Sequence, residues 1–110
     1  MTQPIDPGTC HSMAELRRAI DALDGRIVRL LAHRAALIDR AVELKPAEGL
    51  PARIPERVQA VLDNVRSEAR AVGLDPDLAA RLWQILIEWS IAREERVLGT
   101  ADEEFSCEPQ

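Results

Sequence analysis

The sequence predicts an all-α protein with three helices, a long first helix followed by two shorter ones. Apolar residues recur at alternating steps of three and four, and prolines and glycines divide the chain into three such stretches. No alternating strand pattern competes, and 110 residues is the length of one domain. We expect a helical domain at residues 11–99, between a flexible N-terminus at 1–10 and a disordered acidic tail at 100–110.

The first helix is expected over residues 12–45. Ser12 and Glu15 have the spacing of a capping box, which marks the start of a helix. Pro46 is expected to end it, because the residue before a proline is disfavoured in the helical region. The apolar or small positions of this helix form one seam: Leu16, Ile20, Leu23, Ile27, Leu30, Leu37, Ala41 and Leu44.

This first helix is too long for its own chain to cover. It would extend over roughly 50 Å at 1.5 Å per residue, whereas a compact domain of this size measures about 26 Å across in twice its radius of gyration. The apolar seam therefore needs a second copy of the chain, and we predict a homodimer in which the long helices pack together.

Two shorter helices are expected after a loop at residues 46–54. Proline suits a first helical turn and glycine a helix end, so the second helix is expected to begin at Pro55 and end before Gly73. Asp75 is expected to cap the third helix, which runs to about Leu98. That helix is apolar on most sides, so we expect it to be buried between others.

Composition and charge exclude several classes of function. A net charge of −5 argues against a general nucleic-acid binder. No apolar run is long enough for a membrane span, and residues 1–9 lack the layout of a secretory signal, which predicts a cytoplasmic protein. Cys10 and Cys107 are expected to be free thiols. His11 and His33 lack metal-ligand spacing, so no metal is expected.

Arg34 interrupts the apolar seam of the first helix. Burying an unpaired guanidinium is costly, so Arg34 needs an anionic partner. Lys45 lies about 20° away around the same helix, so both cations project from one face. Either an anionic ligand or a network of interface salt bridges would satisfy them.

Three other polar residues are less informative by themselves. Ser90 and Glu94 share a face of the third helix. Glu94, at a helix end among other charged residues, is typical of a solvated position. Arg17 lies about 100° from the Arg34 face, so it would reach that face only from a partner helix.

Three stretches together resemble the AroQ class of chorismate mutases, over about residues 10–98. They are ELRRAIDALDGRIVRLLAHRAALIDRAVELK, PERVQAVLDNVRSEARAVGLDP and LAARLWQILIEWSIAREE. The resemblance implies an intertwined helical homodimer with two cofactor-free active sites. Each would bind a dicarboxylate and convert chorismate to prephenate by a pericyclic rearrangement.

The resemblance also implies roles for particular residues. Arg17 from the partner subunit and Arg34 would bind substrate carboxylates, and Lys45 would bridge a carboxylate and the ether oxygen. Glu94 would hydrogen-bond the same oxygen, which requires its protonated form, because an ionised carboxylate cannot donate. Two further residues complete the set, namely Glu56 at the substrate hydroxyl and Ser90 near a carboxylate.

The segment entering the second helix departs from many bacterial members of the class. An Asp and an Arg of those members align with Ala52 and Pro55, and Arg53 is a candidate substitute for the missing cation. The Pro-Glu-Arg entry resembles the isochorismate-pyruvate lyase branch, which makes salicylate and pyruvate, whereas Glu94 favours a mutase. An amino-substituted chorismate as substrate and a non-catalytic dimerisation or regulatory module are the remaining alternatives.

Overall fold

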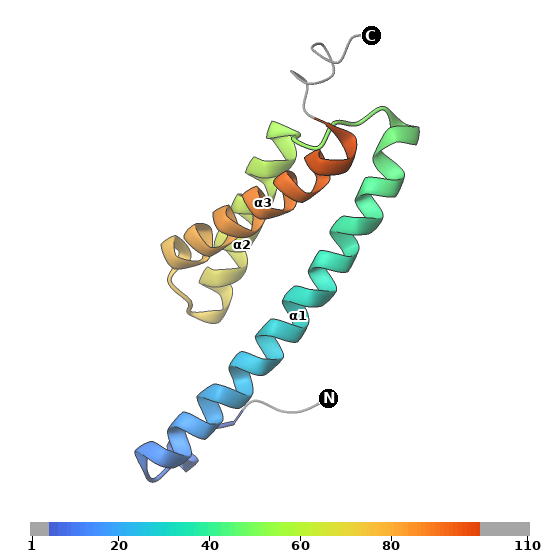
Figure 1. Cartoon of the computed structure of the whole chain (residues 1–110). Helices are drawn as coiled ribbons and strands as arrows, with labels where there is room; N and C mark the ends of the chain where they lie inside the picture. Colours follow the sequence, from blue (N-terminus) through green and yellow to red (C-terminus); the bar gives the residue numbers. More distant parts are fainter. Residues whose placement is uncertain (1–4, 100–110) are drawn as a thin grey trace. The chain divides into compact units, whose positions relative to one another are not determined.

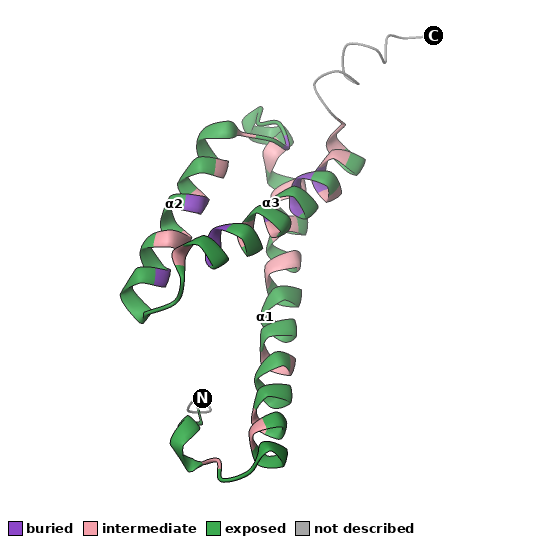
Figure 2. Cartoon of the chain, turned by 90° about the vertical axis from the view of Figure 1, so that its left-hand side faces the viewer, coloured by how far each residue is buried: buried purple, intermediate pink, exposed green. Residues whose placement is uncertain are grey.

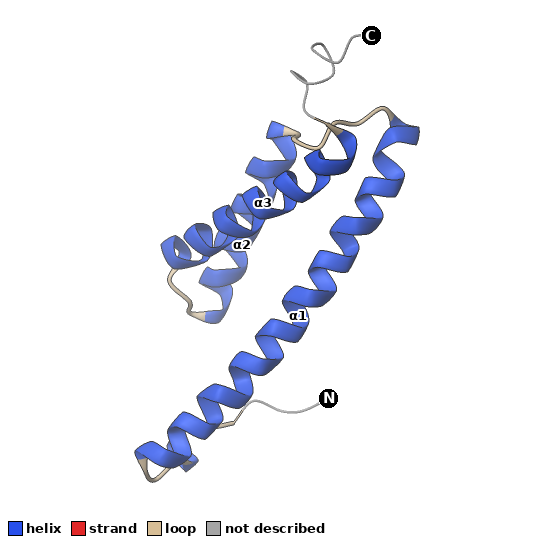
Figure 3. Cartoon of the chain, in the orientation of Figure 1, coloured by secondary structure: helices blue, strands red, loops and turns tan. Residues whose placement is uncertain are grey.

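The computed structural model describes residues 5–99 and is helical throughout its regular elements. It contains a short 3-10 helix, η1 (Pro7–Thr9), and three α-helices, α1 (Met13–Glu48), α2 (Pro55–Val72) and α3 (Pro76–Leu98). Figure 1 labels the α-helices, and Figure 3 shows loops but no strand between them in the described residues. The predicted all-α class with three helices is confirmed, and the tail at 100–110 lies outside the described residues.

The chain divides into two compact units, Met1–Ala36 and Leu37–Gln110, and the boundary falls inside α1. In the first unit, the predicted cap is present, because the backbone N–H of Glu15 donates to Ser12 Oγ at 3.1 Å. The Glu15 carboxylate accepts from the backbone N–H of His11 at 2.8 Å, one residue before the position expected in a capping box.

The end of α1 corrects the predicted boundary, because the helix continues through Pro46 to Glu48. The backbone N–H of Leu50 donates to the Lys45 carbonyl and that of Gly49 to the Pro46 carbonyl. Gly49 has a φ of 68°, so this is a Schellman cap with a left-handed glycine. The cap satisfies carbonyls of the last turn, and the preference against helix before proline is overcome.

The second unit contains a hairpin formed by α2 and α3. The predicted start and end of α2 are confirmed: the helix begins at Pro55 and ends before Gly73, which has a φ of 79°. The carboxylate of Asp75 accepts from the backbone N–H of Asp77 and caps α3. Figure 2 shows buried positions on α2, on α3 and in the loop before α2, but none on α1. The core cluster consists of Ala52, Leu62, Ile87 and Ile91.

One side of α3 stays exposed in this chain, although the whole helix was expected to be buried between others. The buried residues of α3 face α2 and the end of α1, where Glu94 contacts Lys45, and the remaining side stays exposed. Large apolar residues at steps of four, three and four form the α3 stripe, which consists of Leu78, Leu82, Ile85 and Trp89.

Candidate active site

Lys45 and Glu94 form an ion pair between the end of α1 and the last turns of α3. Lys45 Nζ lies 2.6 Å from Glu94 Oε1, and their side chains are 16% and 5% exposed. The contact falls outside hydrogen-bond angles, so Oε1 accepts no hydrogen bond from the described residues. The structure thus brings together two of the residues that the family resemblance implicated.

Glu94 is buried, which corrects the interpretation of it as a solvated residue at a helix end. It lies on the face of α3 that also carries buried Ser90, one turn earlier. Ser90 Oγ donates to the carbonyl of Leu86 at 2.7 Å, so its single proton is used within its own helix. A carboxyl and a hydroxyl therefore lie one turn apart within the packed part of α3.

The Lys45 ammonium has a second contact on its other side. Lys45 Nζ donates to the backbone carbonyl of Ala52 at 2.8 Å. Ala52 is itself part of the buried core, in the loop before α2. An ammonium carries three protons, and this hydrogen bond uses one of them, so the capacity to donate to a ligand remains. The side chain is therefore held in place while it keeps the capacity to donate.

A second ion pair connects the same two helices. The guanidinium of Arg93 donates twice to the carboxylate of Asp39, through Nε to Oδ1 and through Nη2 to Oδ2. The hydrogen bond from Arg93 holds the pKa of Asp39 below its usual value. Arg93 also lies over the Trp89 ring, 5.2 Å from its centre. Sequence reasoning missed this pair, because the residues are 54 positions apart and either charge alone is typical of a solvated helix face.

The remaining predicted site residues differ in their exposure and surroundings. Glu56 is exposed in the first turn of α2. Arg17 is exposed and Arg34 half-buried, both on the part of α1 that belongs to the first unit. Arg53, the candidate substitute cation, donates instead to Glu88 on α3 through both terminal nitrogens. The predicted roles of Glu56, Arg17 and Arg34 therefore stay predictions.

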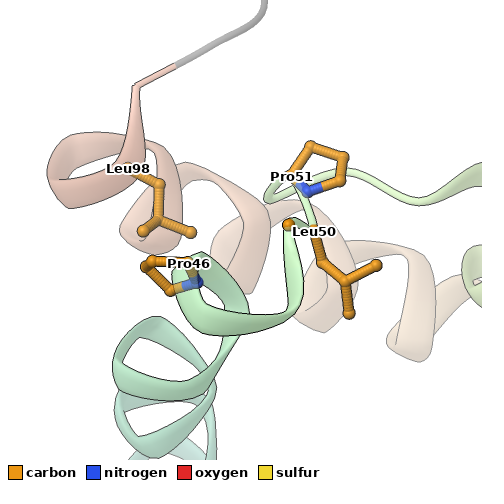
Figure 4. A pocket seen from close by; sticks show the side chains of 5 residues that line it. Pro46, Leu50, Pro51 and Leu98 are labelled. Atoms are coloured by element: carbon orange, nitrogen blue, oxygen red, sulfur yellow. The ribbon is translucent and has the colours of Figure 1, made fainter.

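A hollow of about 440 Å³ lies next to the end of α1. Figure 4 shows the side chain of Leu98 pointing towards Pro46, with Leu50 and Pro51 on the connecting loop. Gly49 completes the lining, which contains no charged side chain. Because a dicarboxylate needs cationic or hydrogen-bonding partners, this hollow is a poor place for one. The candidate active site is the Lys45–Glu94 pair instead.

The described residues form neither a metal-binding cluster nor a membrane-spanning helix. Between residues 5 and 99, no group of three or more His, Cys, Asp or Glu side chains is arranged to hold a metal ion. None of the helices in that range combines the length and the apolar character that crossing a bilayer requires.

Comparison with known proteins identifies the family. Residues 16–95 match the model of the family described as chorismate mutase type II. A chorismate mutase of Methanocaldococcus jannaschii is 33% identical over 88 residues, covering 80% of this chain and 89% of that protein. An isochorismate pyruvate lyase of Pseudomonas aeruginosa is 36% identical over 89 residues, covering 80% and 86%.

A third relative is named for a different substrate. A 4-amino-4-deoxychorismate mutase of Streptomyces venezuelae is 30% identical over 89 residues, covering 81% of this chain and 86% of that protein. All three likenesses cover most of both sequences, and the family match includes Lys45, Glu94 and most of the three helices. The chain belongs to the chorismate mutase type II family.

Proposed function

We propose that this chain is a chorismate mutase, which rearranges chorismate to prephenate without a cofactor. Membership of the family and the likeness to a chorismate mutase over 80% of the chain support this activity. The structural observation that carries the proposal is the Lys45–Glu94 pair. A half-buried ammonium that keeps a spare proton, beside a buried carboxyl, is suited to a substrate oxygen that gains negative charge.

The chemistry explains why such a pair would accelerate the reaction. In this rearrangement, the C–O bond breaks ahead of C–C bond formation, so the ether oxygen becomes negative in the transition state. A free proton of the Lys45 ammonium would donate to that oxygen. Protonated Glu94 would donate a second hydrogen bond. No group attacks the substrate, so the protein contributes by holding the reactive conformer and stabilising the developing charge.

We also propose that the protein works as an intertwined homodimer. The support is apolar surface that one chain leaves exposed. On α3 it is the stripe defined above, and on the first part of α1 it includes Ile20, Leu23, Ile27 and Leu30. Both series have the three-and-four spacing of helix–helix interfaces, and exposed apolar surface on this scale marks an interaction site.

The proposed dimer would complete each site with cations for the two substrate carboxylates. Arg34 of one protomer and Arg17 of the partner subunit would bind one carboxylate each, because a planar guanidinium meets a carboxylate through two hydrogen bonds. Glu56 would accept from the substrate hydroxyl. Ser90 would approach a carboxylate only if its hydroxyl proton turned away from Leu86.

Isochorismate-pyruvate lyase is the second candidate function. It is favoured by the 36% identity to a relative of that name. Ala52 and Pro55 also stand where many bacterial mutases carry an Asp and an Arg, as in the resemblance described above. Glu94 favours the mutase, since the lyase branch resembles members with Gln at this position.

A parallel assay of three substrates tests the proposed function. The purified protein is given chorismate, isochorismate or 4-amino-4-deoxychorismate, and we expect chorismate to be consumed with the highest kcat/KM and to yield prephenate. Salicylate formed from isochorismate at a higher kcat/KM would identify the lyase. Faster turnover of the amino compound would identify an aminodeoxychorismate mutase. Consumption of none of the three would leave a non-catalytic dimerisation or regulatory module.

A further inference from the structure

The short segment Ala52–Arg53, in the loop before α2, is attached to its surroundings in three ways. The Ala52 side chain is buried, with 5% of its surface exposed, in a cluster with Ile87 and Ile91. Its carbonyl accepts the hydrogen bond of the Lys45 ammonium. The next residue, Arg53, is held by Glu88. A segment held on three sides has little freedom to change the direction of its carbonyl.

The Arg53–Glu88 pair has the geometry of a two-pronged clamp. Arg53 Nη1 donates to Glu88 Oε2 at 2.9 Å, and Nη2 donates to Oε1 at 2.6 Å. The pair is half-exposed, with side chains 46% and 59% accessible. The hydrogen bond lowers the pKa of Glu88 and raises that of Arg53. Exposed pairs contribute little to stability in general, so the value of this one lies in its geometry.

The clamp connects directly to the candidate active site through one backbone carbonyl. Glu88 and Glu94 lie on the same helix, whereas Arg53 follows the residue whose carbonyl holds Lys45. With the clamp closed, the Ala52 carbonyl and the Glu94 carboxyl both contact Lys45 Nζ. With the clamp open, the loop would be free to turn that carbonyl away, and the ammonium would lose one of its two contacts.

We propose that Arg53 and Glu88 are positioning residues: their clamp orients the Ala52 carbonyl, which fixes the Lys45 ammonium beside Glu94. The inference rests on the proposed function for its activity readout. It differs from the idea that Arg53 replaces a missing substrate-binding cation, because both terminal nitrogens of its guanidinium already donate to Glu88.

Single and charge-reversed variants separate these two roles. We expect Arg53→Ala and Glu88→Ala each to lower kcat for chorismate by about 5- to 100-fold, because a small misplacement of a transition-state contact is costly. KM should change less than kcat, since the proposed carboxylate contacts of Arg17 and Arg34 are left intact. The double variant R53E/E88R should recover kcat to within about threefold of wild type, because it rebuilds the clamp with its charges exchanged.

The pair Arg40–Glu43 provides the matched control. It is another exposed pair of arginine and carboxylate at 2.6 Å, within one turn of α1, and no hydrogen bond or ion pair of the described residues joins it to the loop or to Lys45. Arg40→Ala should therefore keep wild-type kcat and KM. Urea denaturation of every variant gives the fraction of protein that is folded under assay conditions. We compare kcat at equal folded fractions, so that a loss of stability is not mistaken for a loss of catalysis.

A second readout does not depend on turnover. The carbon resonances of Lys45 Cε and Glu94 Cδ report the contact between the two side chains. We expect both to shift in Arg53→Ala and Glu88→Ala, to stay in place in Arg40→Ala, and to return in R53E/E88R. If wild type consumes none of the three substrates, the proposed function fails, and these resonances still decide whether the clamp positions Lys45.

Two results would overturn the proposal. A raised KM in Arg53→Ala, together with an unimpaired Glu88→Ala, would show that Arg53 binds substrate itself. Wild-type kcat and unshifted resonances in both single variants would show that the clamp does not control Lys45.

Discussion

Lys45 Nζ lies 2.6 Å from Glu94 Oε1, and together they place a cation and a carboxyl where α1 ends against α3. Both side chains are largely removed from water, so each depends on the other for compensation of its charge. The same ammonium would also stabilise charge on a substrate oxygen. Stability and catalysis are therefore coupled at this pair, and suitable variants separate them.

Replacing Lys45 with methionine should remove both contributions. We expect kcat to fall by about 100- to 1,000-fold, the usual loss when one donor to a developing oxyanion is removed. The free energy of unfolding should fall by about 3–5 kcal/mol, because Glu94 becomes an unpaired buried carboxylate. The double variant K45M/E94Q should recover most of that stability and none of the activity. Turnover restored together with stability would contradict a catalytic role for Lys45.

Replacing Glu94 with glutamine tests its role as a hydrogen-bond donor. A carboxyl donates to the ether oxygen only in its protonated form, whereas the glutamine amide always carries protons to donate. We therefore expect Glu94→Gln to keep or raise kcat. Stopped assays of prephenate measure kcat for both proteins. Loss of turnover in Glu94→Gln would remove Glu94 from the role of donor.

Mixing two inactive variants tests the proposed dimer and the origin of Arg17. Arg17→Ala and Arg34→Ala should each abolish turnover and remain dimeric by sedimentation. A heterodimer of the two contains one site with both arginines intact and one site with neither. Unfolding and refolding an equal mixture should therefore restore about a quarter of the wild-type activity.

The control for the mixing experiment is each variant alone, unfolded and refolded in the same way. A mixture that stays inactive although heterodimers have formed would show that Arg17 and Arg34 serve the same protomer. Loss of the dimer in Arg34→Ala would assign that residue to the interface rather than to the substrate.

The fold was predictable where the signals are local. Asp75, Pro55 and Gly73 mark helix ends through their own backbone preferences, and each has the predicted place. Pro46 misled because its effect competes with a cap that forms only once Gly49 and Leu50 fold back on the helix end. Of the two signals at this helix end, Gly49 therefore determines the boundary and Pro46 does not.

The site was less predictable, because its contacts join distant parts of the chain. Nothing local to Glu94 shows that it will be buried, and nothing local to Arg53 shows that Glu88, 35 positions away, will engage it. The family resemblance pointed to Lys45 and Glu94 as site residues. The clamp between Arg53 and Glu88, in contrast, became visible only in the tertiary structure.

Acidification should weaken the contact between α1 and α3 at Asp39. Its pKa is lowered in the folded protein by the hydrogen bond from Arg93, so the contribution to stability is fully present above the ordinary Asp value. That contribution is lost as the pH falls through the lowered pKa. The difference in unfolding free energy between wild type and Asp39→Asn should therefore shrink in acid, and also at high salt, because the pair is exposed. A difference independent of both would mean that the pair contributes through packing.

The glycine cap of α1 should be sensitive to a side chain, whereas a glycine inside the helix should not. Gly49 has a φ of 68°, and although no atom lies within 4 Å of an added Cβ, the left-handed backbone disfavours alanine. We expect Gly49→Ala to lower the free energy of unfolding by about 1 kcal/mol. Gly25 lies within α1, where a Cβ would meet only the end of the Arg29 side chain at 3.6 Å.

Gly25→Ala should therefore raise the free energy of unfolding by up to roughly 1 kcal/mol, the difference in helix propensity between the two residues. Urea denaturation of both variants under identical conditions gives the two signs directly. If Gly49→Ala were as stable as wild type, α1 would not depend on the glycine cap, and an end of the helix at Pro46 would be the alternative. Opposite signs at the two glycines would confirm that α1 continues past the proline and ends at its left-handed cap.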